Sequence, residues 1–379
     1  MPETSPPFTI GIEEEYLLVD PETRALATDP PEALFAACKE ALGSQVSPEF
    51  LRSQIEIGTP VCQTVSEARN ELARLRRAVI DIAAEYGLAP ISASTHPFSE
   101  WQKQVHTDGE RYNVIANDMQ VVVRRLMICG MHVHVGIGDD DDLRIDLMNQ
   151  AAYFLPHLLA LSTSSPFWEG VDTGLMSYRL SVFNEMPRTG LPDRFDSYAE
   201  YARHVQALVD AGLIADATKL WWDLRPSGRF PTLEMRICDA CTTLDDTVAV
   251  AALYLCILRM LYRLKKRNQR WRQYAPMLVN ENRWRAQRYG LDEGLVDFGK
   301  GCLTPYAELV EEIIELTAED AEELGCADNI THLRTIMERG TSAHRQRAIF
   351  RRAIDAGDDA DKGLRDVVDF LISETARST

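Results

Sequence analysis

The sequence predicts a single domain of mixed strands and helices whose C-terminal part is helical. Segments with the period of a strand alternate with segments with the period of a helix from residue 8 to about residue 259, and helical periodicity dominates the rest. A hydrophobic content of 45% in 379 residues suffices for a large core. Because no Gly/Ser-rich or Pro-rich linker divides the sequence, we expect one domain over residues 1–379, with a helical part over about residues 245–379.

Two of the four predicted strands carry glutamates on one face. Successive side chains of a strand point to opposite faces, so residues 8–18 place Glu13 and Glu15 on the face opposite to Ile12. Residues 52–59 place Glu56 opposite to apolar neighbours in the same way. Each strand therefore has an apolar face for the core and a face that carries ionisable groups.

The other two strands repeat this pattern with histidine and glutamate. Residues 127–137 place His132 and His134 on one face, and residues 232–239 place Glu234 on one face. Any one of the four strands is also typical of a solvated face of an antiparallel sheet. The combination favours a concave sheet surface that gathers carboxylates, because Glu and His replace the Thr, Ser and Lys that suit an exposed strand.

The clearest predicted helix follows the second strand. Thr64 is its expected N-cap, Glu67 completes a capping box, and Gly87 follows the last turn. Apolar periodicity predicts further helices over residues 108–126, 142–162, 197–211, 245–267, 305–318 and 327–339. The four aspartates of residues 139–142 are expected to form a solvated turn before a helix, with a metal site as the less favoured alternative.

The charge balance excludes some classes of partner. The chain has 40 basic and 58 acidic residues and a formal net charge of −18. Nucleic acids and anionic membranes are normally bound by a basic face, so we expect neither as a partner. The most apolar run, residues 248–258, is shorter than the roughly 20 residues that span a bilayer, and residues 1–7 lack the pattern of a secretion signal. We expect a cytoplasmic protein with reduced cysteines.

A cluster of carboxylates has a specific chemical meaning. Carboxylates placed side by side repel each other, and a divalent cation relieves that repulsion. Oxygen ligands with one or two imidazoles favour Mg²⁺ or Mn²⁺ over zinc. An adjacent arginine, here Arg236, suits phosphoryl transfer from ATP. The His-x-His pattern of residues 132–134 leaves a zinc or iron metallohydrolase as an alternative.

Known nucleotide-binding and hydrolase motifs do not account for the chain. The sequence has no GxGxxG and no GxSxG. Residues 294–300 come near to a Walker A loop, but Gly301 occupies the position where Ser or Thr would hold Mg²⁺. We therefore expect any nucleotide to be held by the carboxylate-lined sheet.

Several motifs then resemble, in order along the chain, the type-two glutamate-cysteine ligase family, the YbdK-type carboxylate-amine ligases. They are GIEEEY of residues 11–16, QIEIGTP of residues 54–60, ASTHPF of residues 93–98, ERY of residues 110–112, MHVHVG of residues 131–136, the stretch of residues 161–179, LEMR of residues 233–236 and ENRWRA of residues 281–286. The resemblance covers nearly the whole chain.

The resemblance implies an α+β fold. In this fold a curved, mostly antiparallel sheet forms an active-site funnel flanked by helices, similar to the catalytic domain of glutamine synthetase. It implies ATP and two or three Mg²⁺ or Mn²⁺ ions as cofactors. The implied reaction phosphorylates a carboxylate, by default the γ-carboxylate of glutamate, and an amine, by default that of cysteine, then displaces phosphate. Another carboxylate and amine, or a non-catalytic binding protein on the same fold, are the alternatives.

The resemblance also implies roles for individual residues. The implied metal ligands are Glu13, Glu15, Glu49, Glu56, His134 and Glu234. Arg236 and Arg179 are expected in catalysis, and Arg236, Arg111 and Arg285 are expected to contact the phosphates of the nucleotide or a substrate carboxylate. His132 is expected next to the ligands and His96 in shaping a loop. A homodimer or larger symmetric assembly is implied as well.

Overall fold

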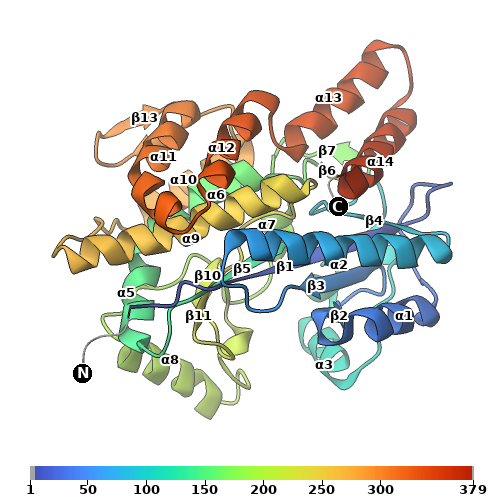
Figure 1. The fold of residues 1–379 in the computed structure, drawn as a ribbon. Coiled ribbons are helices and arrows are strands. Elements are labelled where there is room, and N and C mark those ends of the chain that lie inside the picture. Colours follow the sequence, from blue (N-terminus) through green and yellow to red (C-terminus); the bar gives the residue numbers. More distant parts are fainter. Residues whose placement is uncertain (1–4, 378–379) are drawn as a thin grey trace.

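A seven-stranded sheet lies at the centre of the fold, and long helices pack against one of its faces (Figure 1). The computed structural model describes residues 5–377, except for the side chains of residues 110, 111 and 115. The strand order is β10-β11-β5-β1-β3-β2, with β4 paired to β1, and every pairing is antiparallel. The strands are β1 (Ile10–Val19), β2 (Val46–Pro48), β3 (Gln54–Gly58), β4 (Ala89–Ile91), β5 (Met131–Gly136), β10 (Leu224–Pro226) and β11 (Thr232–Met235).

Helices follow and connect these strands and make up most of the chain after β11. They are α1 (Glu32–Leu42), α2 (Val65–Glu85), α3 (Glu110–Met119), α4 (Val121–Arg124), α5 (Asp141–Ala151), α6 (Leu155–Ser162), α7 (Arg179–Phe183), α8 (Tyr198–Asp210), α9 (Leu244–Lys266), α10 (Pro276–Tyr289), α11 (Tyr306–Glu323), α12 (Ala327–Arg339), α13 (Ser342–Asp355) and α14 (Ala360–Arg377). Short strand pairs are β6 (Phe167–Trp168) with β7 (Val171–Asp172), β8 (Thr189–Gly190) with β9 (Trp221–Trp222), and β12 (Leu295–Asp297) with β13 (Cys302–Thr304).

The predicted α+β fold with a mostly antiparallel sheet is confirmed. All four predicted strands form, within a few residues of their predicted ends, and they are neighbours in one sheet as β11, β5, β1 and β3. The fourth is shorter than predicted because β11 ends at Met235, so Arg236 follows the strand.

The helix predictions differ from the structure at helix ends, in two predicted helices that are divided, and in five helices that were not predicted. The Thr64 side chain accepts a hydrogen bond from the Glu67 amide as predicted. The Glu67 carboxylate accepts from the amide of Gln63 and not from that of Thr64, so only half of the predicted capping box forms. The single helix predicted over residues 108–126 is wrong, because Gln120 has a φ of 50° and separates α3 from α4. The helix predicted over residues 142–162 is likewise divided, by a 3₁₀ turn at Ala152–Phe154. The predicted set omits α1, α7, α10, α13 and α14.

One face of the sheet forms the core with the two longest helices. Ile12 of β1, Ile57 of β3 and Val133 of β5 are buried in the same apolar cluster as Leu72 of α2 and Leu253 of α9. In Figure 1, α2 and α9 run across the sheet on this side. The opposite face of the sheet is therefore left to the ionisable side chains.

Helix α9 is long and apolar enough to cross a membrane by length and composition. However, 78% of its most apolar window is buried inside the structure. This burial, together with its contacts to α2, α5, α6, α11 and α12, is that of a core helix.

Candidate active site

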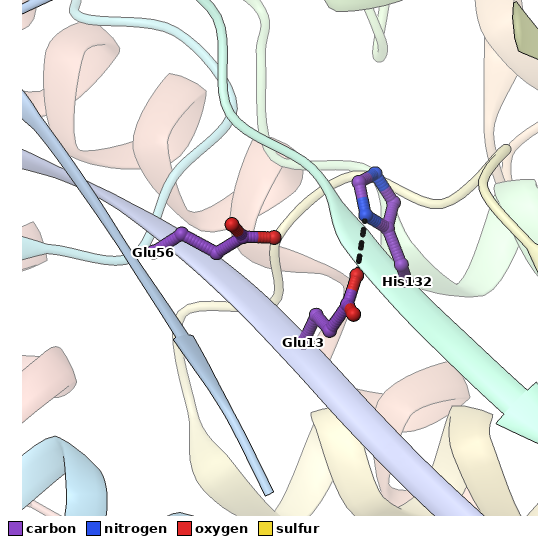
Figure 2. A group of neighbouring side chains, drawn as sticks. All are labelled: Glu13, Glu56 and His132. Carbon is purple, nitrogen blue, oxygen red and sulfur yellow. Dashed lines mark hydrogen bonds and ion pairs between the residues drawn. The ribbon is translucent and has the colours of Figure 1, made fainter. Parts of the chain in front are cut away.

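The polar face of β1 meets its two neighbouring strands in a way that gathers ionisable groups. Glu13 lies opposite His132 in the ladder of β1 and β5, and Glu15 lies opposite Glu56 in the ladder of β1 and β3. Residues directly opposite each other in an antiparallel pair share a face of the sheet. Figure 2 shows Glu13, Glu56 and His132 pointing toward one another from three strands. The register therefore assembles what the sequence pattern could only place strand by strand.

The cluster continues toward both edges of the sheet. Glu234 of β11 lies opposite His134 of β5. Glu49, which follows β2, joins the cluster beside Glu15 and Glu56 from outside the strands. The structure thus brings together all six residues that the resemblance implied as metal ligands.

Their ligand atoms form three groups, each with its atoms within 4.8 Å of one another. The groups are Glu13, Glu56 and His132; Glu13, His134 and Glu234; and Glu15, Glu49 and Glu56. Carboxylate oxygens dominate each group, and this donor set fits Mg²⁺ or Mn²⁺. His132, expected only beside the ligands, is itself a member of one group.

These groups line a cavity of about 580 Å³. Glutamates and histidines of the sheet form one side of it, and side chains from the connecting segments form the others. Aromatic wall residues are Phe50, Tyr112, Phe183, Trp221 and Phe230, and the arginines are Arg179, Arg225, Arg229 and Arg236. A cavity with acidic, basic and aromatic surfaces can hold an anionic ligand with an attached ring or chain.

Glu13 is held in its ionised form by the two histidines. Nδ1 of His132 donates to Oε2 of Glu13 at 3.2 Å, and Nε2 of His134 lies 3.5 Å from Oε1. Burial by itself would raise the pKa of Glu13, but these two imidazoles outweigh it and hold the pKa well below its ordinary value. The pKa of His134 is raised in return: burial opposes protonation, but Glu13 and Glu234 favour it.

The pKa values of Glu49 and Glu56 are shifted in the opposite direction to that of Glu13. Burial raises the pKa of Glu56 to about 7, with further contributions from the charges of Glu13 and Glu15. Burial also raises the pKa of Glu49 well above its ordinary value, and the charges of Glu15 and Glu56 add to it. Three carboxylates with little compensating positive charge form an arrangement that a divalent cation stabilises.

Glu234 is the carboxylate that arginines compensate. Nε and Nη2 of Arg225 donate to its two oxygens at 2.9 and 3.0 Å, and Nη1 of Arg236 donates to Oε1. Burial would raise the pKa of Glu234, but the charges of Arg236 and Arg225 lower it strongly. Nε of Arg236 is buried with no hydrogen-bond partner among the residues that the structure describes, which leaves a donor for a ligand.

Arg179 reaches the same cavity from α7. Its Nη1 donates to the carbonyl oxygen of Ile237 at 3.2 Å and its Nη2 to that of Arg236 at 3.1 Å. The side chain is almost completely buried, and no carboxylate of the described residues lies within ion-pair distance. A buried guanidinium paired only with carbonyl oxygens suits the binding of an anion.

Arg285 is not among the described residues that line the cavity, and its predicted role in phosphate binding stays a prediction. It lies on α10, where Nε donates to the carbonyl oxygen of Gly294 at 2.9 Å and the guanidinium faces Glu293 and the ring of Tyr289. These contacts tie α10 to the loop before β12. The side chain of Arg111 is outside the described residues.

Two arginines that line the cavity were not predicted from the sequence. Arg225 is opposite Glu234 in the hairpin of β10 and β11, so its position depends on a register that the sequence does not show. Arg229 lies in the turn of the same hairpin. The only local signal was the Ser-Gly pair of that turn, which predicts a hairpin but no function.

Comparison with known proteins gives an independent view of the whole chain. The pattern of glutamate-cysteine ligase family 2 matches residues 9–368. A Rhodospirillum rubrum protein with the provisional name glutamate–cysteine ligase 2 is 62% identical over 374 residues, which cover 98% of this chain and 96% of that protein. A protein of the same provisional name from Jannaschia sp. is 55% identical over 367 residues, covering 97% and 96%.

Two solved structures share the fold at low sequence identity. A glutamate–cysteine ligase from Francisella tularensis in complex with AMP has a TM-score of 0.70 and 13% identity, with 97% of this chain and 89% of that chain covered. A bifunctional glutathione synthetase from Pasteurella multocida has a TM-score of 0.69 and 16% identity, with 98% and 53% covered.

Proposed function

The chain belongs to glutamate-cysteine ligase family 2, and from this premise we propose that it joins a carboxylate to an amine through an acyl phosphate. Membership makes it an ATP-dependent ligase that forms an amide bond. Glutamate and cysteine are the default substrates of the proposal, since the relatives' names contain them. The observation that carries the proposal is the cavity in which three carboxylate and imidazole groups lie beside Arg179 and Arg236.

The carboxylate and imidazole groups would hold two or three Mg²⁺ or Mn²⁺ ions. The residues concerned are Glu13, Glu15, Glu49, Glu56, His134 and Glu234, with His132 as a further donor. Bound ions would supply positive charge that offsets the negative charge of the phosphates. The supporting observation is that Glu49 and Glu56 are half-buried among other carboxylates with little compensating positive charge.

The arginines bind and orient the anionic reactants. Arg236, with its unpaired Nε, would contact the transferred phosphoryl group. The guanidinium of Arg179 is buried and its side-chain hydrogen bonds go to carbonyl oxygens, so it would contact phosphate or the reacting carboxylate. Arg111 keeps its expected role as a phosphate contact.

Arg229 would bind the part of the substrate that does not react. Of the four described arginines that line the cavity, it is the one whose side chain makes no hydrogen bond or ion pair with any described residue. Its neighbour Phe230 is 54% exposed and meets the ring of His134 edge-on at 6.1 Å, so the turn reaches the ligand groups. A guanidinium at this position suits the α-carboxylate of glutamate.

The proposed reaction has two steps. In the first, a carboxylate oxygen forms a bond to the γ-phosphorus of ATP, and the bond to ADP breaks. In the second, the amine nitrogen attacks the acyl carbon, phosphate leaves, and the amine loses a proton to a base. The protein's part is to position the reactants and to stabilise the negative charge that moves during both steps.

Hydroxamate formation tests this proposal without knowledge of the natural amine. Purified protein would receive ATP, Mg²⁺, hydroxylamine and one of a panel of carboxylic acids that includes glutamate. We expect γ-glutamyl hydroxamate and an equal amount of ADP, because hydroxylamine traps the activated acyl group. If no acid yields hydroxamate or ADP, the proposed reaction is wrong.

We further propose that the protein works in the cytoplasm as a homodimer or larger symmetric assembly. All eight cysteines are free thiols and seven of them are buried, which suits a reducing compartment. Light scattering of the purified protein tests the assembly, and a monomeric mass at micromolar concentration would contradict it.

A further inference from the structure

Gly130 lies between a carboxylate and an arginine of the cavity. It directly precedes β5, where its amide donates to Oε2 of Glu15 at 2.7 Å and its carbonyl oxygen accepts from the Glu15 amide at 3.2 Å. It also forms an isolated antiparallel bridge with Asp239. The backbone of Gly130 is therefore fixed on both sides by segments that carry residues of the site.

The guanidinium of Arg179 occupies the space that a side chain at Gly130 would need. A Cβ atom added there would lie 2.4 Å from Nη2, 3.0 Å from Cζ and 3.2 Å from Nε of Arg179. All three atoms belong to the planar group, so the guanidinium lies against the Cα of Gly130. Contacts this short force a displacement, even from an alanine.

Arg179 has little freedom to move aside. Its terminal nitrogens donate to the carbonyl oxygens of Arg236 and Ile237, and Cζ lies 5.5 Å from the centre of the Phe183 ring. Only 3% of the residue is exposed. A guanidinium that leaves these acceptors while still buried loses hydrogen bonds that no water replaces.

The backbone of Arg179 is anchored as well. Its amide donates to Oγ of Ser165 at 3.1 Å, and that hydroxyl donates to Oδ2 of the buried Asp239 at 2.7 Å. Oγ of Ser177 donates to Oδ1 of Asp239 at 2.8 Å. Asp239 thus holds the loop before α7 on the same segment that carries Arg236.

We propose that Gly130 is a positioning residue that sets the distance between the Arg179 guanidinium and the carboxylate cluster. Because Gly130 has no side chain, the Arg179 guanidinium can lie against the start of β5, the strand that contains His132 and His134. The amide of Gly130 orients Glu15. This inference rests on the proposed function, in which Arg179 contacts phosphate or the reacting carboxylate.

The test compares Gly130→Ala with a matched glycine of the same sheet. At Gly11 an added Cβ would lie 3.8 Å from Cβ of His134 and 4.0 Å from Oγ1 of Thr59, which are ordinary contacts. We expect G130A to lower kcat/KM for hydroxamate formation by about 10- to 100-fold, since a displacement of about 1 Å has effects of this size. G11A should stay within about twofold of the wild type.

A double-mutant cycle shows whether G130A acts through Arg179. In the R179A background the clash is absent, so adding G130A should change kcat/KM by less than about threefold. An equal loss in both backgrounds would mean a general effect on β5 and would overturn the proposal. If G130A fails to fold, G130A/R179A should fold with the unfolding midpoint of R179A, and its failure to do so would also overturn the proposal.

Binding measurements separate this inference from the ligase reaction itself. Calorimetry with a non-hydrolysable ATP analogue and Mn²⁺ should show weaker binding for G130A and R179A than for wild type and G11A. Mn²⁺ binding without nucleotide should be unchanged in G130A. Loss of Mn²⁺ binding would mean that the substitution acts through Glu15 and not through Arg179, and would overturn the proposal. If wild type forms no hydroxamate but the binding pattern holds, the reaction is wrong and the positioning role stands. Equal binding by all four proteins overturns the positioning role.

Discussion

Arg76 of α2 and Glu14 of β1 form an ion pair in which both side chains are completely buried, on the face of β1 opposite to the cavity. Nε and Nη2 of Arg76 donate to the two oxygens of Glu14, and Thr247 of α9 and the Tyr16 hydroxyl also donate to that carboxylate. Glu14 lies between Glu13 and Glu15, so this pair fixes the strand directly behind two residues of the cluster. The two longest helices are tied to β1 by one carboxylate.

Breaking this pair should destabilise the whole fold. We expect Arg76→Met to lower the free energy of unfolding by about 3–5 kcal/mol, because it leaves the Glu14 charge buried without its partner. Urea denaturation measures the loss. The exposed pair of Arg74 and Glu71 provides the control, since R74A should cost less than about 1 kcal/mol. A loss for R76M as small as that for R74A would contradict the expected role.

Removing one carboxylate of the cluster should remove metal binding while the fold persists. We expect Glu56→Gln and Glu234→Gln each to weaken Mn²⁺ binding and lower kcat/KM about 100-fold or more, since each removes a charged ligand. Titration followed by electron paramagnetic resonance measures the binding. Asp139→Asn is the matched control, because Asp139 is an exposed acidic residue outside the cavity lining. Near-normal Mg²⁺-dependent activity in E56Q or E234Q would refute their assignment.

Removing the metal ions should also lower the stability of the folded protein. A ligand that binds only the folded protein stabilises it by about 2.7 kcal/mol at 100 times its dissociation constant. We expect added Mn²⁺ to raise the wild-type unfolding midpoint and a chelator to reverse this rise. The midpoint of E56Q should respond much less, and an equal response of both proteins would point to metal sites elsewhere.

The role proposed for Arg229 predicts a selective kinetic effect. Arg229→Ala should raise KM for glutamate by about 10-fold or more, because a charge-assisted hydrogen-bond pair to the α-carboxylate is lost. KM for ATP should stay within about twofold. γ-Aminobutyrate offers the same reacting carboxylate without the α-carboxylate, so its kinetics should not differ between R229A and wild type. A rise in KM for ATP instead would assign Arg229 to the nucleotide.

The buried His96 should make the free energy of unfolding depend on pH. Its Nδ1 accepts from the amides of Phe98 and Ser99, and Nε2 donates to the carbonyl oxygen of Arg24, so the buried ring is neutral. Burial lowers the pKa of His96 to about 4, and the hydrogen bond to the Arg24 carbonyl opposes this shift. Between that value and the ordinary pKa of about 6.5 only the unfolded chain takes up the proton, so stability is full above this range and falls as pH drops through it.

Protonation of His96 in the unfolded chain should lower the free energy of unfolding by about 3 kcal/mol between its ordinary pKa and its pKa in the fold. His157 is buried and its pKa is lowered to about 4 in the same way, so the wild-type curve contains both residues. We expect His96→Asn to lose part of the pH dependence while the part due to His157 persists. Urea denaturation at several pH values between 7 and 5 measures the slope, and an unchanged slope in H96N would show that His96 does not titrate as described.

Local geometry made part of the site predictable from the sequence. The period of two in a strand is a property of the backbone itself, so Glu13 and Glu15 had to share a face, and so did His132 and His134. The capping role of Thr64 followed from short-range hydrogen bonding in the same way. Sequence alone also indicated that the shared faces form one carboxylate-rich surface suited to a divalent cation.

Only the tertiary structure decided which of these groups meet. Glu15 faces Glu56 because β1 pairs with β3 in one register, and a shift by one residue would turn every side chain to the other face. Arg225 reaches Glu234 through another such register, and Arg285 is held elsewhere by α10. Strand order, register and helix ends such as that at Gln120 depend on contacts between residues far apart in the chain. Such contacts produce no periodic pattern in the sequence, so only the tertiary structure shows them.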